Sequence, residues 1–348
     1  MEAITESARA RTTRSDQEPI LPARFSQSAA IARELAGDHW IRAVKGLDVF
    51  SVTAADAPRL MNEIGRIREV EFRKEGGGTG RREDVDCFDL GDTPYRQLAV
   101  WDAQQQEVVA AYRYILCRDE HCGRPRPPLA TERLFEFSND FRRDYLPYSI
   151  ELGRSVVNRS AKRRFLGLFA AWAGLGALVS EHRDIRYLFG KVTMYPTYNV
   201  LARDVLLHFL RLYFPDPAAL VRPRQHLEVV PASAELGAVF RGRDYATDYA
   251  RLRTELKELG ELIPPLLISY LGLTQTMKAF GTARNPEFGN VDETAILITV
   301  SDINKDARTR FIGSYERICP GHFCDWSHDC EANTTLDCRA VTGRRTRR

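Results

Sequence analysis

The chain has 348 residues, of which 44% are hydrophobic and 28% charged, a composition ordinary for a globular protein of one large domain or two. Its 50 basic residues nearly balance 47 acidic ones, and the net charge is only +3. This balance argues against a nucleic-acid-binding protein, so we expect no nucleic-acid partner.

Two segments could direct the chain to a membrane, and neither has the required pattern. Residues 1–27 mix Arg, Glu, Asp and Ser without an apolar core, which excludes a secretory signal there. The most apolar stretch, Phe165–Ser180, has 16 residues and two central glycines, whereas a spanning helix needs roughly 20 apolar residues. We therefore expect a buried helix at this stretch and a cytoplasmic protein.

The first half of the chain predicts a helix followed by a meander of strands. After a polar leader over residues 1–44, apolar residues at helical spacing predict a helix over Ala54–Phe72. The glycine-rich segment Arg73–Arg82 predicts a flexible loop. Strand-like runs then follow at Cys87–Leu90, Gln97–Asp102 and Val108–Cys117.

The second half predicts strands that alternate with helices. Strand patterns at Ser149–Val157 and Tyr187–Met194 flank the apolar helix, a helix follows over Asn199–Tyr213, and a last strand is expected over Val291–Ser301. This order predicts an α/β fold with a mixed, partly parallel sheet. We divide the chain into the leader, a core over residues 45–215, an extension over residues 216–316 that completes the fold, and a disordered tail over residues 317–348.

The tail contains Cys319, Cys324, Cys330 and Cys338 together with His322 and His328. None of these cysteine pairs has the C-x2-C spacing that is typical of a zinc site. We therefore predict no metal site.

A set of charged residues in the core occurs in an informative order. Arg68 and Phe72 are four apart, Asp86 and Asp89 are three apart, Arg113 follows on a predicted strand, and Glu151 and Arg154 form a Glu-x-x-Arg motif. In this order the set resembles the charged framework of the acyl-homoserine-lactone synthases, which are relatives of the GNAT acyltransferases. The resemblance implies an enzyme that takes an acyl chain from a thioester.

The run Phe189–Asn199 departs from the lactone synthases. It is similar instead to the lyso-ornithine lipid synthases and the bacterial N-acyl-amino-acid synthases, a likeness that covers residues 45–315. The resemblance implies a GNAT-like sheet whose two central strands splay apart to admit the pantetheine arm of the donor. Residues 151–157 and Tyr187–Met194 would be those two strands.

Glu151 is the predicted general base or amine-orienting carboxylate, with Arg154 beside it in the catalytic site. The alternative is that Glu151 is a structural partner of Arg154 or Arg113. Because residues three apart on a strand face opposite sides, Glu151 and Arg154 would share a side only if a bulge or turn intervened.

The substrate-binding residues expected from the resemblance are Arg68, Phe72, Asp86, Asp89, Arg113, Tyr195 and Tyr198. The aspartates would attract a cationic amino-acid acceptor, and Arg68 and Arg113 could hold its carboxylate. Alternatively, the four charged residues form a buried ion-pair network that joins the first helix to the sheet. The two tyrosines could contact the thioester or the acceptor, or serve only in packing.

The donor-binding residues are expected in the basic turn before the apolar helix, at Arg159, Lys162, Arg163 and Arg164. These cations suit a phosphopantetheine phosphate or the acidic surface of acyl carrier protein, although a solvated face is the alternative. The turn lacks the R/Q-x-x-G-x-G/A pattern of CoA-using GNAT proteins. Acyl carrier protein is therefore the expected donor and partner, acyl-CoA is disfavoured, and no bound cofactor is expected.

Taken together, these patterns predict an N-acyltransferase that moves a long, 3-hydroxylated acyl chain to the α-amine of a small amino acid of the glycine or ornithine type. The apolar run Leu262–Leu273 could line an acyl tunnel, lie against a membrane surface, or pack as a core helix. Two alternatives to the predicted function are an autoinducer synthase and a non-catalytic protein that binds the membrane surface.

Overall fold

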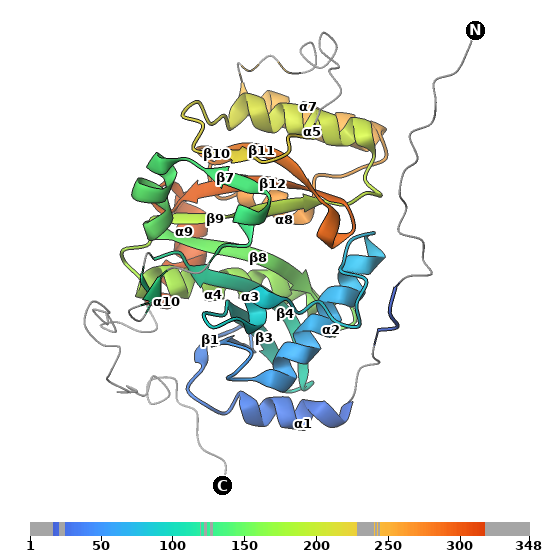
Figure 1. Ribbon diagram of the computed structural model, residues 1–348, viewed down its shortest axis with the longest axis vertical. Coiled ribbons are helices and arrows are strands. Elements are labelled where there is room, and N and C mark those ends of the chain that lie inside the picture. Colours follow the sequence, from blue (N-terminus) through green and yellow to red (C-terminus); the bar gives the residue numbers. More distant parts are fainter. Residues whose placement is uncertain are drawn as a thin grey trace.

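The computed structural model describes residues 17–20, 25–118, 120–121, 124–125, 128–227, 240, 242 and 244–316 (Figure 1). The predictions for residues 1–16 and for the tail over residues 317–348 lie outside the described residues.

An eight-stranded sheet forms the centre of the molecule, in the order β1-β2-β3-β4-β8-β9-β12-β11. All neighbouring strands are antiparallel except β8 and β9, which are parallel. The strands are β1 (Trp40–Val44), β2 (Leu47–Val52), β3 (Arg96–Asp102), β4 (Glu107–Leu116), β8 (Ser149–Val157), β9 (Tyr187–Met194), β11 (Lys278–Asn285) and β12 (Val291–Thr299). The predicted α/β fold with a mixed, partly parallel sheet is confirmed.

Helices cover both faces of this sheet (Figure 1). On one face, α1 (Phe25–Glu34) and α2 (Pro58–Lys74) pack on β2, β3 and β4, and on the other α4 (Gly167–Glu181) covers β1 to β4. The other α-helices in the part of the chain that the structure describes are α3 (Cys87–Leu90), α5 (Val200–Tyr213), α7 (Tyr245–Glu258), α8 (Pro265–Leu271), α9 (Lys305–Phe311) and α10 (Gly313–Glu316). Short strand pairs join β7 (Phe135–Phe137) to β10 (Val221–Pro223), and β5 (Glu120–His121) to β6 (Arg124–Pro125).

The sequence prediction missed β1, β2 and β11. β1 and α1 lie within residues 1–44, the range that we expected to be a polar leader, and β1 is the edge strand of the sheet. β2 is buried at every position, so its residues show no alternation of polar and apolar side chains.

The predicted strand at Cys87–Leu90 is wrong, because these residues form the single helical turn α3. Asp86 accepts hydrogen bonds from the backbone N–H groups of Phe88 and Asp89, and the Asp89 side chain accepts one from the N–H of Asp86. This reciprocal capping box stabilises a helical start that the run of four residues alone does not reveal.

The apolar stretch forms the buried helix α4, as predicted. Its two central glycines allow close packing, since a Cβ at Gly174 would lie 2.7 Å from Val49 and one at Gly176 would lie 2.3 Å from the Phe311 carbonyl oxygen. Among the described residues, no helix combines the length and apolarity that crossing a membrane requires.

The two central strands, β8 and β9, separate along their length. Their parallel pairing runs from Ser149 opposite Tyr187 to Leu152 opposite Gly190, and beyond this point each strand continues with no pairing to the other among the described residues. β4 and β12 remain paired to their outer sides. The predicted splay is therefore confirmed, and it begins directly after Leu152 and Gly190.

Gly190 marks the last close contact before the splay. A Cβ at this position would lie 2.5 Å from the Leu152 carbonyl oxygen, which is far inside van der Waals contact. We expect Gly190→Ala to lower the free energy of unfolding by about 1–3 kcal/mol, because the two strands must move apart where they still pair.

The matched control is Gly153→Ala, on the opposite strand, where an added Cβ meets no atom within 4 Å. This change should alter stability by less than about 0.5 kcal/mol. Chemical denaturation of both variants measures the difference, and equal stability of the two would contradict the close-contact argument.

Candidate active site

A cavity of about 1670 Å³ opens where β8 and β9 separate. Its walls include the residues of β8 after Leu152 and of β9 after Gly190, together with parts of α2, α4, α7 and α8. Small-molecule pockets usually occupy about 300–1,000 Å³, so this cavity has room for an elongated ligand.

The cavity wall contains both charged and apolar side chains. Its charged and polar members include Glu71, Arg113, Glu151, Arg154, Lys191, Tyr195 and Glu293. Its apolar members include Leu168, Leu262, Ile263, Leu266 and Ile268, of which four lie in or just before α8. The predicted core-packing role is confirmed for part of the run Leu262–Leu273, since Leu267, Tyr270 and Leu271 are buried in the core. Other residues of the run line the cavity, and their contact with an acyl chain stays a prediction.

A buried ionic network lies behind the charged wall. Arg68 Nη1 lies 3.2 Å from Asp89 Oδ2, and Arg113 Nη1 lies 2.7 Å from Asp86 Oδ1 and 3.2 Å from Asp89 Oδ2. Gln97 joins the network by accepting from Arg68 and donating to Asp89. Although burial opposes ionisation of Asp86, the Arg113 charge and hydrogen bond hold the pKa of that carboxyl well below its usual range.

This arrangement separates the predicted substrate-binding residues into two groups. Arg68 and Asp89 are fully buried, and neither they nor Asp86 line the cavity. Arg113 does line the cavity, and Asp86 and Asp89 fix its guanidinium from behind. The geometry matches the alternative of an ion-pair network, in which Arg68, Asp86 and Asp89 position Arg113 and Arg154.

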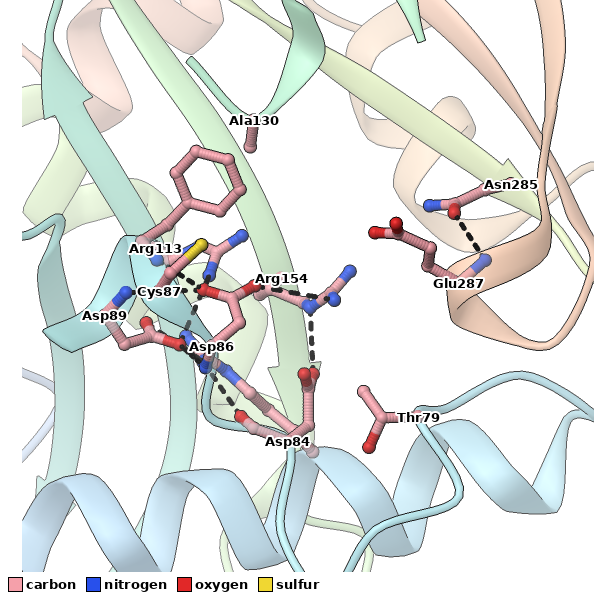
Figure 2. Close-up of polar contacts among 12 residues, drawn as sticks. Thr79, Asp84, Asp86, Cys87, Asp89, Arg113, Ala130, Arg154, Asn285 and Glu287 are labelled. Atoms are coloured by element: carbon pink, nitrogen blue, oxygen red, sulfur yellow. Dashed lines mark hydrogen bonds and ion pairs between the residues drawn. The ribbon is translucent and has the colours of Figure 1, made fainter. Parts of the chain in front are cut away.

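Arg154 reaches this network because β8 contains a bulge. The register between β4 and β8 shifts between Ala111 and Arg113, and Arg154 has a left-handed φ of 51°. Its Nε lies 2.8 Å from Asp84 Oδ2 and its Nη2 lies 3.8 Å from Asp86 Oδ2, as Figure 2 shows. Its guanidinium also lies 3.9 Å from the centroid of the Phe288 ring, so Arg154 is held at the cavity wall from several sides.

Glu151 has different partners from those expected. Its Oε1 accepts hydrogen bonds from the Thr131 backbone N–H at 2.8 Å and the Thr131 hydroxyl at 2.5 Å, and its Oε2 accepts from the Tyr95 hydroxyl. The alternative in which Glu151 is a structural partner of Arg154 or Arg113 is therefore wrong. Glu151 lines the cavity, and its role as general base stays a prediction.

Tyr95 links Glu151 to the turn that precedes Thr131. Burial, reinforced by the Glu151 carboxylate, raises the pKa of Tyr95 well above its ordinary value, so this hydroxyl keeps its proton at neutral pH. The same oxygen accepts a hydrogen bond from the Ala130 N–H at 2.9 Å. Tyr95 and Glu151 together hold the turn at Ala130–Thr131 against β8.

The three other residues predicted to bind substrate all lie at the cavity wall. Phe72, Tyr195 and Tyr198 line the cavity, with Phe72 packed edge-on against Phe288 and the Tyr198 hydroxyl donating to the Leu262 carbonyl at 2.8 Å. Burial raises the pKa of Tyr195 above its ordinary value. Direct contact of these residues with a substrate stays a prediction.

Of the four basic residues before α4, two line the cavity and two do not. Arg159 and Arg164 are lining residues, whereas Lys162 donates to Glu107 and Gln105, and Arg163 to the Lys45 and Gly46 carbonyls. Arg253 and Lys257 of α7, which the sequence did not single out, line the same cavity. The basic residues near the cavity therefore come from two separated segments.

Comparison with known proteins identifies the family. Residues 67–172 match the family model described as an acetyltransferase (GNAT) domain. A glycine N(alpha)-acyltransferase of Phocaeicola vulgatus is 43% identical over 283 residues, which is 78% of this chain and 86% of that protein. A glycine N(alpha)-acyltransferase of Bacteroides thetaiotaomicron is 44% identical over 274 residues, which is 77% and 81% of the two chains.

This chain belongs to that family of amide-forming acyltransferases. The crystal structure of the acyl-homoserine-lactone synthase LasI aligns with a TM-score of 0.39 and 12% identity, covering 77% of this chain and 95% of that one. The family assignment does not depend on this distant likeness.

One feature of this acyltransferase escaped the sequence analysis. Lys191 of β9 and Glu293 of β12 form an ion pair of 2.9 Å at the cavity wall. The two residues lie diagonally across antiparallel neighbours, since Glu293 is opposite Thr193 and Lys191 is opposite Ala295. A charged residue at the start of the otherwise apolar run Ala295–Val300 was the available signal for Glu293, while nothing in the sequence pairs it with Lys191.

Among the described residues, no group of three or more His, Cys, Asp and Glu side chains could hold a metal ion. The cysteines and histidines of the tail lie outside those residues.

The buried network provides a test of what positions Arg113 in this acyltransferase. We expect Arg68→Met to reduce the free energy of unfolding by about 3–5 kcal/mol, because it leaves the Asp89 charge with less compensation in a buried site. Arg66→Met on the same helix is the control, since Arg66 forms its ion pair with Glu63 at a partly exposed position. Its cost should be about 1 kcal/mol or less. Urea unfolding compares the variants, and a cost for Arg68→Met no larger than the control's would show that the network does not stabilise this site.

Proposed function

We propose that this acyltransferase transfers a long acyl chain from a thioester on acyl carrier protein to the α-amine of glycine, which forms an N-acylglycine. The observation that carries the proposal is the cavity at the splay, whose wall joins charged groups beside the parted strands to apolar side chains from α8. Glycine is the proposed acceptor because two relatives that match more than three quarters of the chain carry that name.

The splay suits the thioester donor. Beyond Leu152 and Gly190, the facing backbones of β8 and β9 have no pairing with each other, so their N–H and C=O groups are available to the amides of a pantetheine arm. The reacting carbonyl would then lie beside Arg154 and Tyr195. Donors fixed at this place stabilise the oxyanion that develops during attack.

The reaction then needs no covalent enzyme intermediate. The amine nitrogen attacks the thioester carbonyl carbon, a C–N bond forms, and the C–S bond breaks as the tetrahedral intermediate collapses. The acceptor ammonium loses two protons over the reaction, of which one ends on the departing thiolate and the other is released. Glu151, on β8 in the cavity wall, is the carboxylate that we propose receives that proton through water.

Basic side chains support acyl carrier protein as the donor. Arg159, Arg164, Arg253 and Lys257 all line the cavity, and their charges suit a phosphopantetheine phosphate and an acidic carrier surface. The chain also lacks the glycine-rich turn that CoA-using relatives carry before the apolar helix. We also propose that the acyl chain carries a 3-hydroxyl group, a feature that the family resemblance in the sequence implies.

Purified protein incubated with 3-hydroxyhexadecanoyl acyl carrier protein and pooled amino acids tests this function. We expect thiol release together with the mass of N-(3-hydroxyhexadecanoyl)glycine, and much slower turnover with palmitoyl-CoA or acetyl-CoA. An acyl product on ornithine instead would change the acceptor, and a lactone product from S-adenosylmethionine would favour the autoinducer alternative. Absence of any acyl amino acid would refute the proposal.

The apolar side chains of the cavity wall predict that the enzyme prefers donors with long acyl chains. Leu168→Trp should narrow the cavity beside α4, and we expect it to reduce kcat/KM for a hexadecanoyl donor relative to an octanoyl donor by about tenfold or more. Leu212→Trp is the control, because Leu212 is partly exposed on α5 and does not line the cavity. If both variants keep the wild-type ratio of the two donors, the acyl chain does not occupy this wall.

A further inference from the structure

The Lys191–Glu293 ion pair occupies the position where the two central strands begin to separate. Lys191 is the first residue of β9 after Gly190, the last residue paired to β8. Glu293 reaches it from β12, the strand on the other side of β9. Both side chains line the cavity, yet they are only 14% and 4% exposed, so this pair is nearly buried at the cavity wall.

The strands β9 and β12 do not depend on this ion pair to remain side by side in the sheet. β9 and β12 already share a ladder that runs from Tyr187 opposite Thr299 to Met194 opposite Asp292. Burying two opposite charges costs desolvation energy that their attraction only partly offsets, so an apolar pair would be equally stable here. A charged pair at a cavity wall is therefore available to bind a ligand that carries charges.

Counting contacts over the residues that the structure describes, each side chain of the pair can still form a further hydrogen bond. Glu293 Oε2 accepts from Lys191 at 2.9 Å and from Asn285 Nδ2 at 3.2 Å, while Oε1 accepts from none of the described residues. Lys191 Nζ carries three donors and contacts Glu293 and, at 3.4 Å, the Ala130 carbonyl oxygen. One acceptor and one donor therefore remain side by side at the cavity wall.

The charges are in the states that this arrangement requires. Burial alone would raise the pKa of Glu293, but the nearby Lys191 ammonium outweighs burial and lowers it below the ordinary value. Arg154 lowers the pKa of Glu293 further, so both an anion and cations face the cavity at neutral pH.

We propose that Lys191 and Glu293 form the acceptor subsite, which binds the zwitterion of a small α-amino acid, with Glu293 Oε1 taking the ammonium and Lys191 Nζ taking the carboxylate. An α-amino acid presents an ammonium and a carboxylate on the same short backbone, and the subsite presents the complementary charges on two side chains that lie 2.9 Å apart. Binding at the start of the splay places the amine next to the proposed thioester carbonyl. This inference rests on the proposed function and names the residues that select its acceptor.

The test uses two acceptors that share the ammonium but differ in the carboxylate. Wild-type protein with acyl carrier protein donor should acylate glycine with a higher kcat/KM than glycinamide. Lys191→Met should reduce kcat/KM for glycine by about 10- to 100-fold, the usual effect of losing a hydrogen bond to a charged group, and change glycinamide much less. Lys191→Arg should retain part of the preference for glycine.

Glu293→Gln gives the complementary pattern, because both acceptors carry the ammonium. It should raise KM for glycine and glycinamide alike and leave KM for the donor unchanged. Lys305→Met is the matched control, since Lys305 is exposed at the start of α9 and does not line the cavity. It should preserve the preference for glycine.

The ratio of the two acceptors separates recognition from folding, because it does not depend on the fraction of protein that is folded. The inference is overturned if Lys191→Met lowers kcat/KM for both acceptors by the same factor or leaves the wild-type preference for glycine intact. Calorimetric titration of glycine without donor gives a second readout, in which wild-type protein binds and Lys191→Met does not. If wild-type protein binds glycine in this way but makes no amide, the proposed function fails and the subsite stands. If amide forms but Lys191→Met keeps the wild-type ratio of the two acceptors, only the proposed subsite is refuted.

Discussion

The parting of β8 and β9 after Leu152 and Gly190 is the constraint on which the rest of the site depends. Gly190 allows the strands to approach closely up to this point, since its missing side chain makes room for the Leu152 carbonyl. Because each strand is still paired on its outer side, the sheet continues while a cavity opens inside it. A sheet interior becomes accessible to a ligand without loss of the surrounding core.

The charged residues around this opening form two layers with different tasks. Arg68, Asp86 and Asp89 lie behind the wall, where they bind one another and fix Arg113. The bulge at Arg154 turns its side chain toward Asp84 and Asp86 while leaving it at the cavity. Buried ion pairs of this kind contribute little net stability but hold side chains in one geometry, which suits a site where a carbonyl and an amine must meet.

The proposed chemistry and the proposed chain-length preference depend on different elements of the fold. Side chains of β8, β9 and β12 supply the charges, whereas α4 and α8 supply the apolar wall. The basic residues Arg159, Arg164, Arg253 and Lys257 lie along the same cavity and come from segments on both sides of α5 in the sequence. The proposed carrier protein would therefore meet cations that only the folded chain brings together.

By itself, the sequence determined the strands and helices with regular patterns, from the long α2 and α4 to β8 and β9, because local periodicity reflects burial on one face or on both. It also identified Glu151, Arg154 and the charged set around Arg68. Tertiary structure alone decided what these residues contact: Glu151 binds Tyr95 and Thr131, and Lys191 meets Glu293 from a strand far away in sequence. Strand order, register and bulges set such contacts, and they arise from long-range pairing that no local pattern encodes.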